Sequence, residues 1–153
     1  MVKARKQLES MPDGKARREL SDALDALEAA QKAQATAQAV AIRKEGKAID
    51  AFEASVDALE DFRNEVDCLD EYRQDMGNIE KVQKAFSSLK ASIKKEHKLS
   101  LEGQRADMEA TAAEKAFNDA SMRVEEALKS AKQMAEVGTA STKPLPKYQH
   151  KTI

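Results

Sequence analysis

The sequence predicts an all-α protein folded as an elongated antiparallel helical hairpin, or coiled coil. The 153 residues include four Phe, two Tyr, no Trp, five Gly and three Pro, a composition that argues against β-rich folds. No proline stands between Pro12 and Pro144. Within that stretch the large apolar residues recur at alternating steps of three and four, which is typical of packed helices.

Composition divides the chain into three segments. Residues 1–14 form a basic amino-terminal segment that ends in the turn signal Met-Pro-Asp-Gly, and residues 15–138 form the helical hairpin. Residues 139–153 contain two prolines and no apolar period, which predicts an extended tail.

Two rows of large apolar residues follow the heptad spacing with which helices pack knobs into holes. The rows are Ile49, Phe52, Val56, Leu59, Val66 and Leu69, and then Ile79, Val82, Phe86, Leu89 and Ile93. We expect them to supply the packing seam of the hairpin. Two helices shield only part of such seams, and Phe62, Tyr72 and Leu99 fall outside the simplest stripe. We therefore expect the remaining apolar surface to be buried against other subunits.

The hairpin turn is expected near residues 75–78, where Asp-Met-Gly-Asn combines residue types that accept turn geometry. A turn there places residues 50–75, with a net charge of −8, opposite residues 78–103, with a net charge of +3. The opposite charges of the two stretches favour this pairing.

Gly46 and Gly103 leave a second architecture open. If the helices also broke at these glycines, the chain would form an up-down four-helix bundle. Alanine-rich stretches at 29–41 and 110–120 favour the hairpin, because small side chains let helices approach closely. They predict an alanine-packed zone in mid-arm, with bulkier packing toward the turn. The seam of this zone is formed either by the alanines or by the glutamines Gln31, Gln34 and Gln38.

No motif in the chain predicts catalysis, a metal or a cofactor. The acids between residues 57 and 71 have no Glu-x-x-His partner, so we interpret them as a solvated or partner-facing stripe. The chain has one cysteine, Cys68, and two histidines, too few for a zinc site of the usual Cys/His kind. We expect His97 to be a partly buried polar residue of the seam.

Partner-binding residues are expected at the two ends of the chain. The basic amino-terminal region offers Arg5, Arg17 and Arg18 to an acidic partner, although such residues also occur in solvated tails. The carboxy-terminal tail combines extended backbone with apolar or amphipathic groups, as groove-binding peptides do. Its candidate residues are Lys143, Leu145, Tyr148 and Ile153. A tail without a role is the alternative.

These features favour a non-catalytic structural or assembly protein that works as one coiled-coil subunit of a larger particle, such as a virion, secretion or cytoskeletal assembly. The expected partners are proteins: further copies of the chain, other subunits of one assembly, or both. A nucleic-acid partner is disfavoured by the net charge of −1 and by the absence of interleaved aromatics. The alternatives are a soluble helical adaptor or chaperone, and an enzyme.

The expected location of the protein follows from two features that its sequence lacks. The amino terminus lacks the apolar core of a secretory signal, and no stretch is apolar enough for a membrane span. We therefore expect synthesis in the cytoplasm, followed by incorporation into the assembly.

Overall fold

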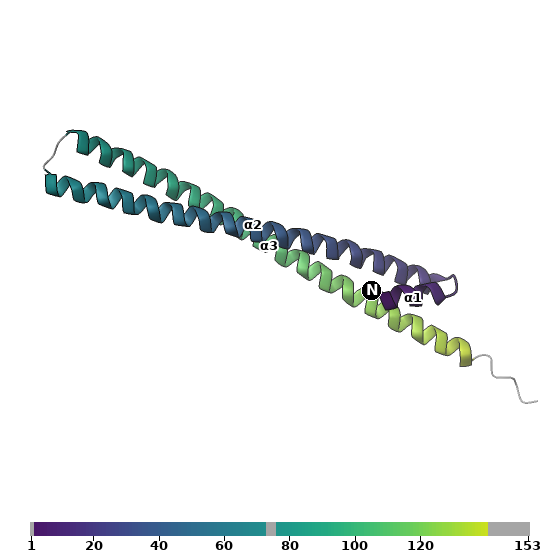
Figure 1. Ribbon diagram of the computed structural model, residues 1–153. Helices are drawn as coiled ribbons and strands as arrows, with labels where there is room; N and C mark the ends of the chain where they lie inside the picture. Colours follow the sequence, from purple (N-terminus) through teal and green to yellow (C-terminus); the bar gives the residue numbers. More distant parts are fainter. Residues whose placement is uncertain (1, 73–75, 141–153) are drawn as a thin grey trace, which may run out of the picture. The chain divides into compact units, whose positions relative to one another are not determined.

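The described part of the protein is entirely helical apart from one short connection. The computed structural model describes residues 2–72 and 76–140, and these residues form three helices and no strand (Figure 1). The helices are α1 (Val2–Ser10), α2 (Lys15–Tyr72) and α3 (Met76–Ala140). The predicted all-α class with a long helical hairpin is confirmed.

The four-helix alternative is wrong, because α2 continues through Gly46 and α3 continues through Gly103. A glycine inside a helix costs about 1 kcal/mol relative to alanine, which these long helices tolerate. Gly77 lies within the first turn of α3 and not in a separate turn. Asp75, the first residue of the predicted turn, lies outside the described residues.

The contacts divide the chain into two units. Unit 1 combines residues up to Lys32 with residues from Lys115 onward, and unit 2 is Ala33–Glu114. Each unit therefore contains one part of α2 and one part of α3, and α1 belongs to unit 1.

Unit 1 has a conventional apolar core shared by its three helical parts. Leu20, Leu24 and Leu27 of α2 are almost completely buried. They form one cluster with Ala4 from α1 and with Ala120 and Val124 from α3. Burying a leucine side chain stabilises a fold by about 1.5–3 kcal/mol, so these three leucines dominate the stability of unit 1.

The connection between α1 and α2 is held by local hydrogen bonds. The amide nitrogen of Met11 donates to the Leu8 carbonyl over 3.2 Å, and that of Arg18 donates to the Gly14 carbonyl over 3.2 Å. Arg17 Nη1 lies 2.6 Å from Asp13 Oδ1. These contacts order the chain between the end of α1 and the first turn of α2.

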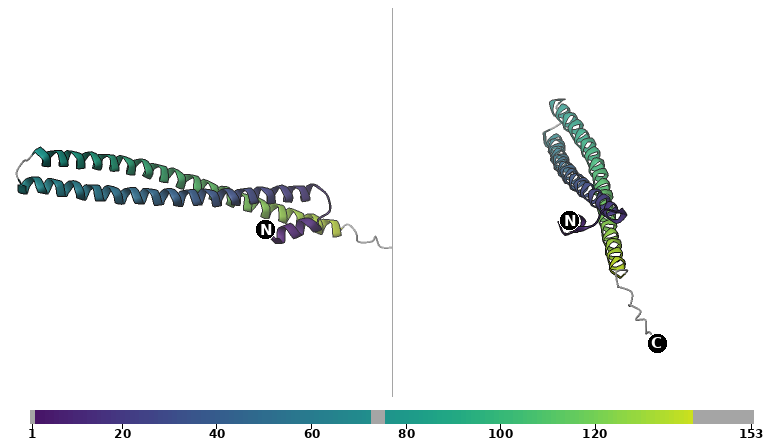
Figure 2. Two further views of the ribbon diagram at one scale, coloured as in Figure 1. Left: turned by 45° about the horizontal axis from the view of Figure 1, so that its top comes forward. Right: turned by 90° about the vertical axis from the view of Figure 1, so that its right-hand side faces the viewer.

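In unit 2, α2 and α3 lie side by side in both views of Figure 2. They meet along a row of buried and half-buried residues that recurs at alternating steps of three and four, here named the inner seam. On α2 it comprises Gln34, Ala37, Ala41, Lys44, Ala48, Ala51, Ser55, Ala58 and Phe62. On α3 it comprises Val82, Ala85, Leu89, Ser92, Glu96, Leu99, Gly103, Ala106, Ala110 and Ala113. This strict heptad spacing is that of an antiparallel coiled coil.

The inner seam consists mainly of small residues. Ala41, Ala51, Ser55 and Ala106 are all buried, and a Cβ built on Gly103 would lie 4.0 Å from the Lys44 carbonyl oxygen. Small side chains bring the two backbones close, which leaves little room for larger side chains between them. The alanine zone therefore extends further toward the α2–α3 connection than the sequence analysis predicts.

Two further sequence predictions are corrected by the inner seam. Leu89 and Val82 do lie in it, but Ile49, Phe52 and Val56 are about half exposed and lie outside it. Conversely, Phe62 and Leu99, which the apolar spacing predicts outside the stripe, belong to the seam. Among the glutamines only Gln34 is half-buried, so alanines form most of the seam in that region.

Polar contacts also cross the inner seam. Ser55 Oγ lies 2.7 Å from Glu96 Oε2, and Lys44 Nζ lies 2.5 Å from Glu102 Oε2. The hydrogen bond from Lys44, followed by the attraction of the same ammonium group, lowers the pKa of Glu102. These pairs, and the ring contact of Phe62 with Phe86, connect α2 and α3 in the antiparallel hairpin.

Candidate protein-interaction surface

Among the large apolar side chains that unit 2 exposes, six are here named the apolar face. Each is between 46% and 55% exposed, whereas the alanines of the inner seam are buried or half-buried. The apolar face comprises Ile49, Phe52, Val56 and Leu59 of α2 with Phe86 and Ile93 of α3. Many of the large apolar residues of unit 2 are thus outside, while most residues of the inner seam are small, which differs from an ordinary core.

The six residues belong to a single side of unit 2. On α2 each follows an inner-seam residue by one position, as Phe52 follows Ala51 and Val56 follows Ser55. The same is true on α3, where Phe86 follows Ala85. One position is a turn of about 100° around a helix. Both helices are right-handed and they run antiparallel. The residue that follows a seam residue therefore lies on the same side of the helix pair in α2 as in α3. The rows on α2 and α3 therefore form one continuous face.

The opposite side of unit 2 is mostly polar. Residues that precede the inner seam by one position include Asp50 and Asp61 on α2 and Lys84 and Lys95 on α3. Two shallow hollows on this side are lined by such residues, one of them by Asp61 and Lys84 and the other by Asp50 and Lys95. Unit 2 is therefore amphipathic as a pair of helices, with one charged side and one apolar side.

The apolar face is not flat. A hollow on α2 is lined by Val56, Leu59, Phe62 and Val66, with charged residues at its edge. The Phe62 and Phe86 rings meet with their centroids 5.5 Å apart, and Lys90 Nζ lies 5.5 Å from the Phe86 centroid. Aromatic side chains beside a groove are frequent anchors of protein interfaces.

Charges of opposite sign flank the two helices of this face. On α2, Glu53, Glu60 and Asp67 recur every seven residues beside the apolar row, and Arg63 lies in the row. On α3, Lys90 lies in the row between Phe86 and Ile93, and Lys94 lies beside it. Ion pairing does not neutralise these six groups, because the ion pair formed by the described residues of unit 2 joins Lys44 to Glu102, although Lys90 also contacts the Phe86 ring. Their charges are therefore available to a partner.

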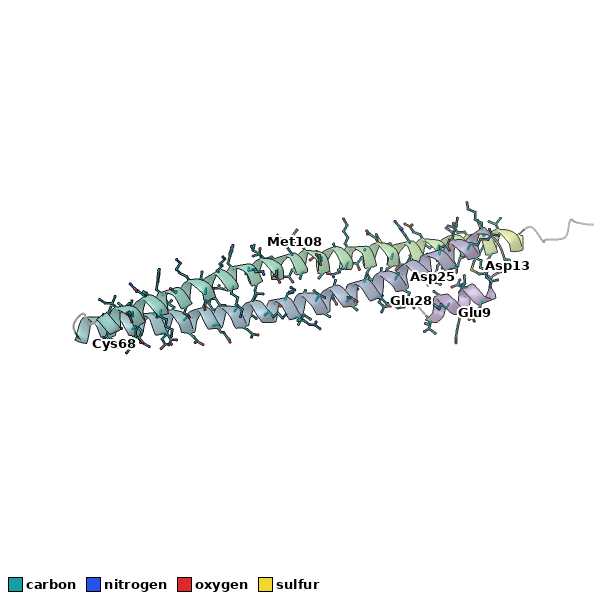
Figure 3. All side chains as sticks on the ribbon, turned by 90° about the horizontal axis from the view of Figure 1, so that it is seen from above. Glu9, Asp13, Asp25, Glu28, Cys68 and Met108 are labelled. Carbon is teal, nitrogen blue, oxygen red and sulfur yellow. The ribbon has the colours of Figure 1, made fainter. Side chains whose placement is uncertain are left out.

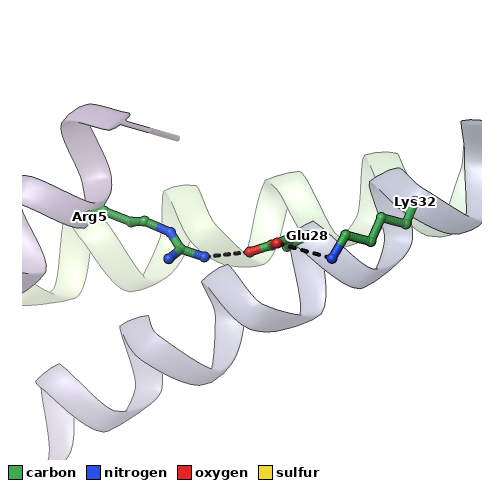
Figure 4. A network of polar contacts seen from close by, with 3 residues as sticks. All are labelled: Arg5, Glu28 and Lys32. Carbon is green, nitrogen blue, oxygen red and sulfur yellow. Dashed lines mark hydrogen bonds and ion pairs between the residues drawn. The ribbon is translucent and has the colours of Figure 1, made fainter.

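The three arginines predicted to bind a partner belong to unit 1. Arg5 pairs with Glu28, which also pairs with Lys32 Nζ at 3.2 Å (Figure 4). The hydrogen bond and charge of Lys32, and then the charge of Arg5, lower the pKa of Glu28. Arg17 is engaged by Asp13, and Arg18 is exposed in the first turn of α2. Two of the three thus hold unit 1 together.

The carboxy-terminal candidates lie beyond Ala140. Lys143, Leu145, Tyr148 and Ile153 are outside the described residues, so the interaction predicted for them stays a prediction.

Other kinds of site find little support in the described residues. Residues 2–72 and 76–140 contain no group of three His, Cys, Asp or Glu side chains that could hold a metal ion. Cys68 is exposed, and Met108 is 73% exposed (Figure 3). His97 is exposed on the surface, so its predicted place in the seam is wrong. In the same part of the chain, none of the helices combines the length and apolar character needed to span a bilayer.

Comparison with known proteins gives no match: no family model, no curated protein and no solved structure is significantly similar to this chain.

Proposed function

We propose that this protein is a non-catalytic structural or assembly protein, a helical subunit of a larger multi-subunit particle such as a virion, secretion or cytoskeletal assembly. The observation that carries the proposal is the apolar face. Six half-exposed large side chains present roughly 500 Å² of surface, within the range of about 300–600 Å² at which the largest patch on a monomer is often functional.

The arrangement of the inner seam supports the same proposal. Burying Phe52 and Val56 between α2 and α3 would have removed much more apolar area from water than burying alanines does. The sequence instead places large apolar residues where a partner of this chain can cover them. An apolar surface of this size is typical of a site at which another molecule binds.

An adaptor or chaperone is the second candidate function. The hollow at Val56, Leu59 and Val66 favours it, because a groove of this kind accepts an apolar side chain of a client. A client-binding protein would leave this face open between encounters, whereas an assembly subunit would keep it covered.

The experiment compares two valines of α2 in the cells from which the protein comes. Val56, on the apolar face, is 46% exposed, and Val40, outside it, is 40% exposed. Tagged versions carrying Val56→Asp or Val40→Asp are sedimented from lysates through a sucrose gradient. We expect the unaltered protein and the Val40→Asp variant to sediment rapidly, in the fractions that contain a large particle. We expect the Val56→Asp variant to remain near the top of the gradient, as a small species does.

The two candidate functions give different gradients. Unaltered protein that sediments only as a small species would count against the assembly role. If that small species also contained one defined client, and the Val56→Asp variant no longer bound this client, the result would favour the adaptor function over the assembly role.

A further inference from the structure

We propose that a second copy of this chain covers the apolar face, with α2 of each copy lying on α3 of the other in an intermolecular four-helix bundle. This inference deepens the proposed function and rests on the same surface. It adds the identity of the occupant and the arrangement of the two copies.

The symmetry of a pair of identical chains limits the choices. Two copies that meet through the same face are related by a two-fold axis. If the axis is parallel to the helices of unit 2, α2 lies on the partner's α3. If the axis is perpendicular to the helices and within the interface plane, α2 lies on the partner's α2.

Charge complementarity selects the first arrangement. The α2 side of the apolar face carries Glu53, Glu60 and Asp67 against one cation, Arg63, whereas the α3 side carries Lys90 and Lys94. Laying α2 on α2 would bring two acidic rows together, and laying α3 on α3 would bring the lysines together. Laying α2 on α3 pairs acids with lysines at both contacts of the bundle.

The register follows from contacts within one chain. The backbone of Lys44 lies close to Gly103, and the ring of Phe62 contacts that of Phe86, so each pair lies at about one level. A two-fold axis parallel to the helices leaves every residue at its own level. Val56 of one copy therefore meets Ile93 of the other, and Glu60 of one copy lies beside Lys90 of the other.

The area of the face is sufficient for such a pair. The six side chains expose roughly 500 Å² per copy, and the flanking charged residues bring this near the roughly 800 Å² per partner of a standard interface. Ile42, which is 70% exposed and follows Ala41 of the inner seam, extends the row.

The test measures the dissociation constant of the purified full-length chain by sedimentation equilibrium. We expect a dimer, and we expect Val56→Asp to raise its dissociation constant by at least about 100-fold, because both symmetric contacts lose a buried apolar group. Val40→Asp is the matched control and should leave the constant within about threefold. Helical circular dichroism of both variants should match that of the unaltered protein, because both side chains point away from the inner seam.

Charge reversals test the arrangement. Glu60→Lys and Lys90→Glu should each weaken the dimer roughly tenfold, and the double variant should recover most of the loss. If α2 lay on α2 instead, Glu60→Lys alone would either create an attraction to another acid of the partner's row or exchange one like-charge pair for another, and would so strengthen the dimer or leave it unchanged. A strengthened or unchanged dimer would therefore overturn the proposed arrangement.

Three other outcomes would overturn the proposed occupant. The first is a full-length chain that stays monomeric at roughly 100 μM, where a specific dimer would form. The second is an equal effect of Val40→Asp and Val56→Asp. The third is a monomer that dimerises only when residues 141–153 are deleted, which would assign the face to the chain's own tail.

Failure of this inference is distinguishable from failure of the proposed function. If the purified chain is monomeric but the Val56→Asp variant no longer sediments with the particle, the assembly role remains supported, with a different partner on the apolar face. A dimer that never enters a particle would leave the inference standing and remove the assembly role.

Discussion

The hydroxyl of Ser55 on α2 lies 2.7 Å from the carboxylate of Glu96 on α3, at a point where Ser55 is 7% exposed. This contact marks how closely the two helices approach in unit 2. Only a small side chain occupies the position, and its hydroxyl donates a hydrogen bond to a carboxylate from the facing helix.

Enlarging Ser55 should therefore destabilise unit 2 more than truncating it. Ser55→Ala loses a hydrogen bond, and we expect a loss of about 1 kcal/mol in the free energy of unfolding. Ser55→Leu must also force the helices apart, which costs typically 1–3 kcal/mol in a packed interior. Urea denaturation followed by circular dichroism measures both. A Ser55→Leu protein as stable as the unaltered one would show that the seam is not closely packed.

Replacing either interior glycine by alanine should stabilise the protein. Nothing lies within 4 Å of a Cβ built on Gly46, and a Cβ on Gly103 meets the Lys44 carbonyl oxygen at 4.0 Å, an ordinary contact. Each Gly→Ala change should raise the free energy of unfolding by about 0.5–1 kcal/mol, because alanine is the better helix former. Thermal melts of the two variants check this. Destabilisation by Gly103→Ala alone would mean that the helices are closer than the contact at Lys44 indicates.

Acid should weaken the ion pair between Lys44 and Glu102. The pKa of Glu102 is lowered from 4.5 in the folded chain, so the pair stabilises the fold above the unfolded pKa and is lost as pH falls through the folded pKa. We expect Glu102→Gln to lower the urea midpoint at pH 7 and to have less effect as the pH decreases below about 4.5. Urea titrations of both proteins between neutral and acidic pH measure this. A difference that stayed constant across that range would contradict the assignment.

Truncation of the core leucine of unit 1 should be among the most damaging single changes. Leu20 is 0% exposed and belongs to the cluster that joins α1, α2 and α3. Leu20→Ala should cost about 2–5 kcal/mol, while Met108→Ala, at a 73% exposed position, should stay within about 0.5 kcal/mol. Urea denaturation of the two variants makes the comparison. A similar loss for both would argue against the core described for unit 1.

Most of the fold can be predicted from the sequence, but the assignment of its packing surfaces cannot. The lack of proline and the three-four periodicity are local properties, so they identify α2 and α3 directly. The row through Ala51 and Ser55 and the row through Phe52 and Val56 have the same period and differ by one residue. Periodicity cannot decide which of two such rows faces α3, and side-chain size alone favours the wrong one.

The sequence nevertheless contains a pattern that indicates which row faces α3. Small residues occupy the alternating positions without interruption from Ala48 to Ala58, and close helix approach requires such a run. The neighbouring row of large apolar residues has the same period and is the more conspicuous of the two. His97 was misplaced for the same reason, since its predicted burial was extrapolated from Ile93, which is itself exposed.

The separation of the inner seam from the apolar face has a consequence for how the protein can change. Alanine loses no rotamer freedom on burial, so the hairpin forms without ordering the long side chains of Phe52 or Ile93. Apart from Phe62, which contacts Phe86 and lines the hollow beside Val56, the two surfaces consist of separate residues. Substitutions can therefore alter the strength or choice of a partner while the hairpin keeps its stability, which makes the specificity of association a property that selection can adjust independently of folding.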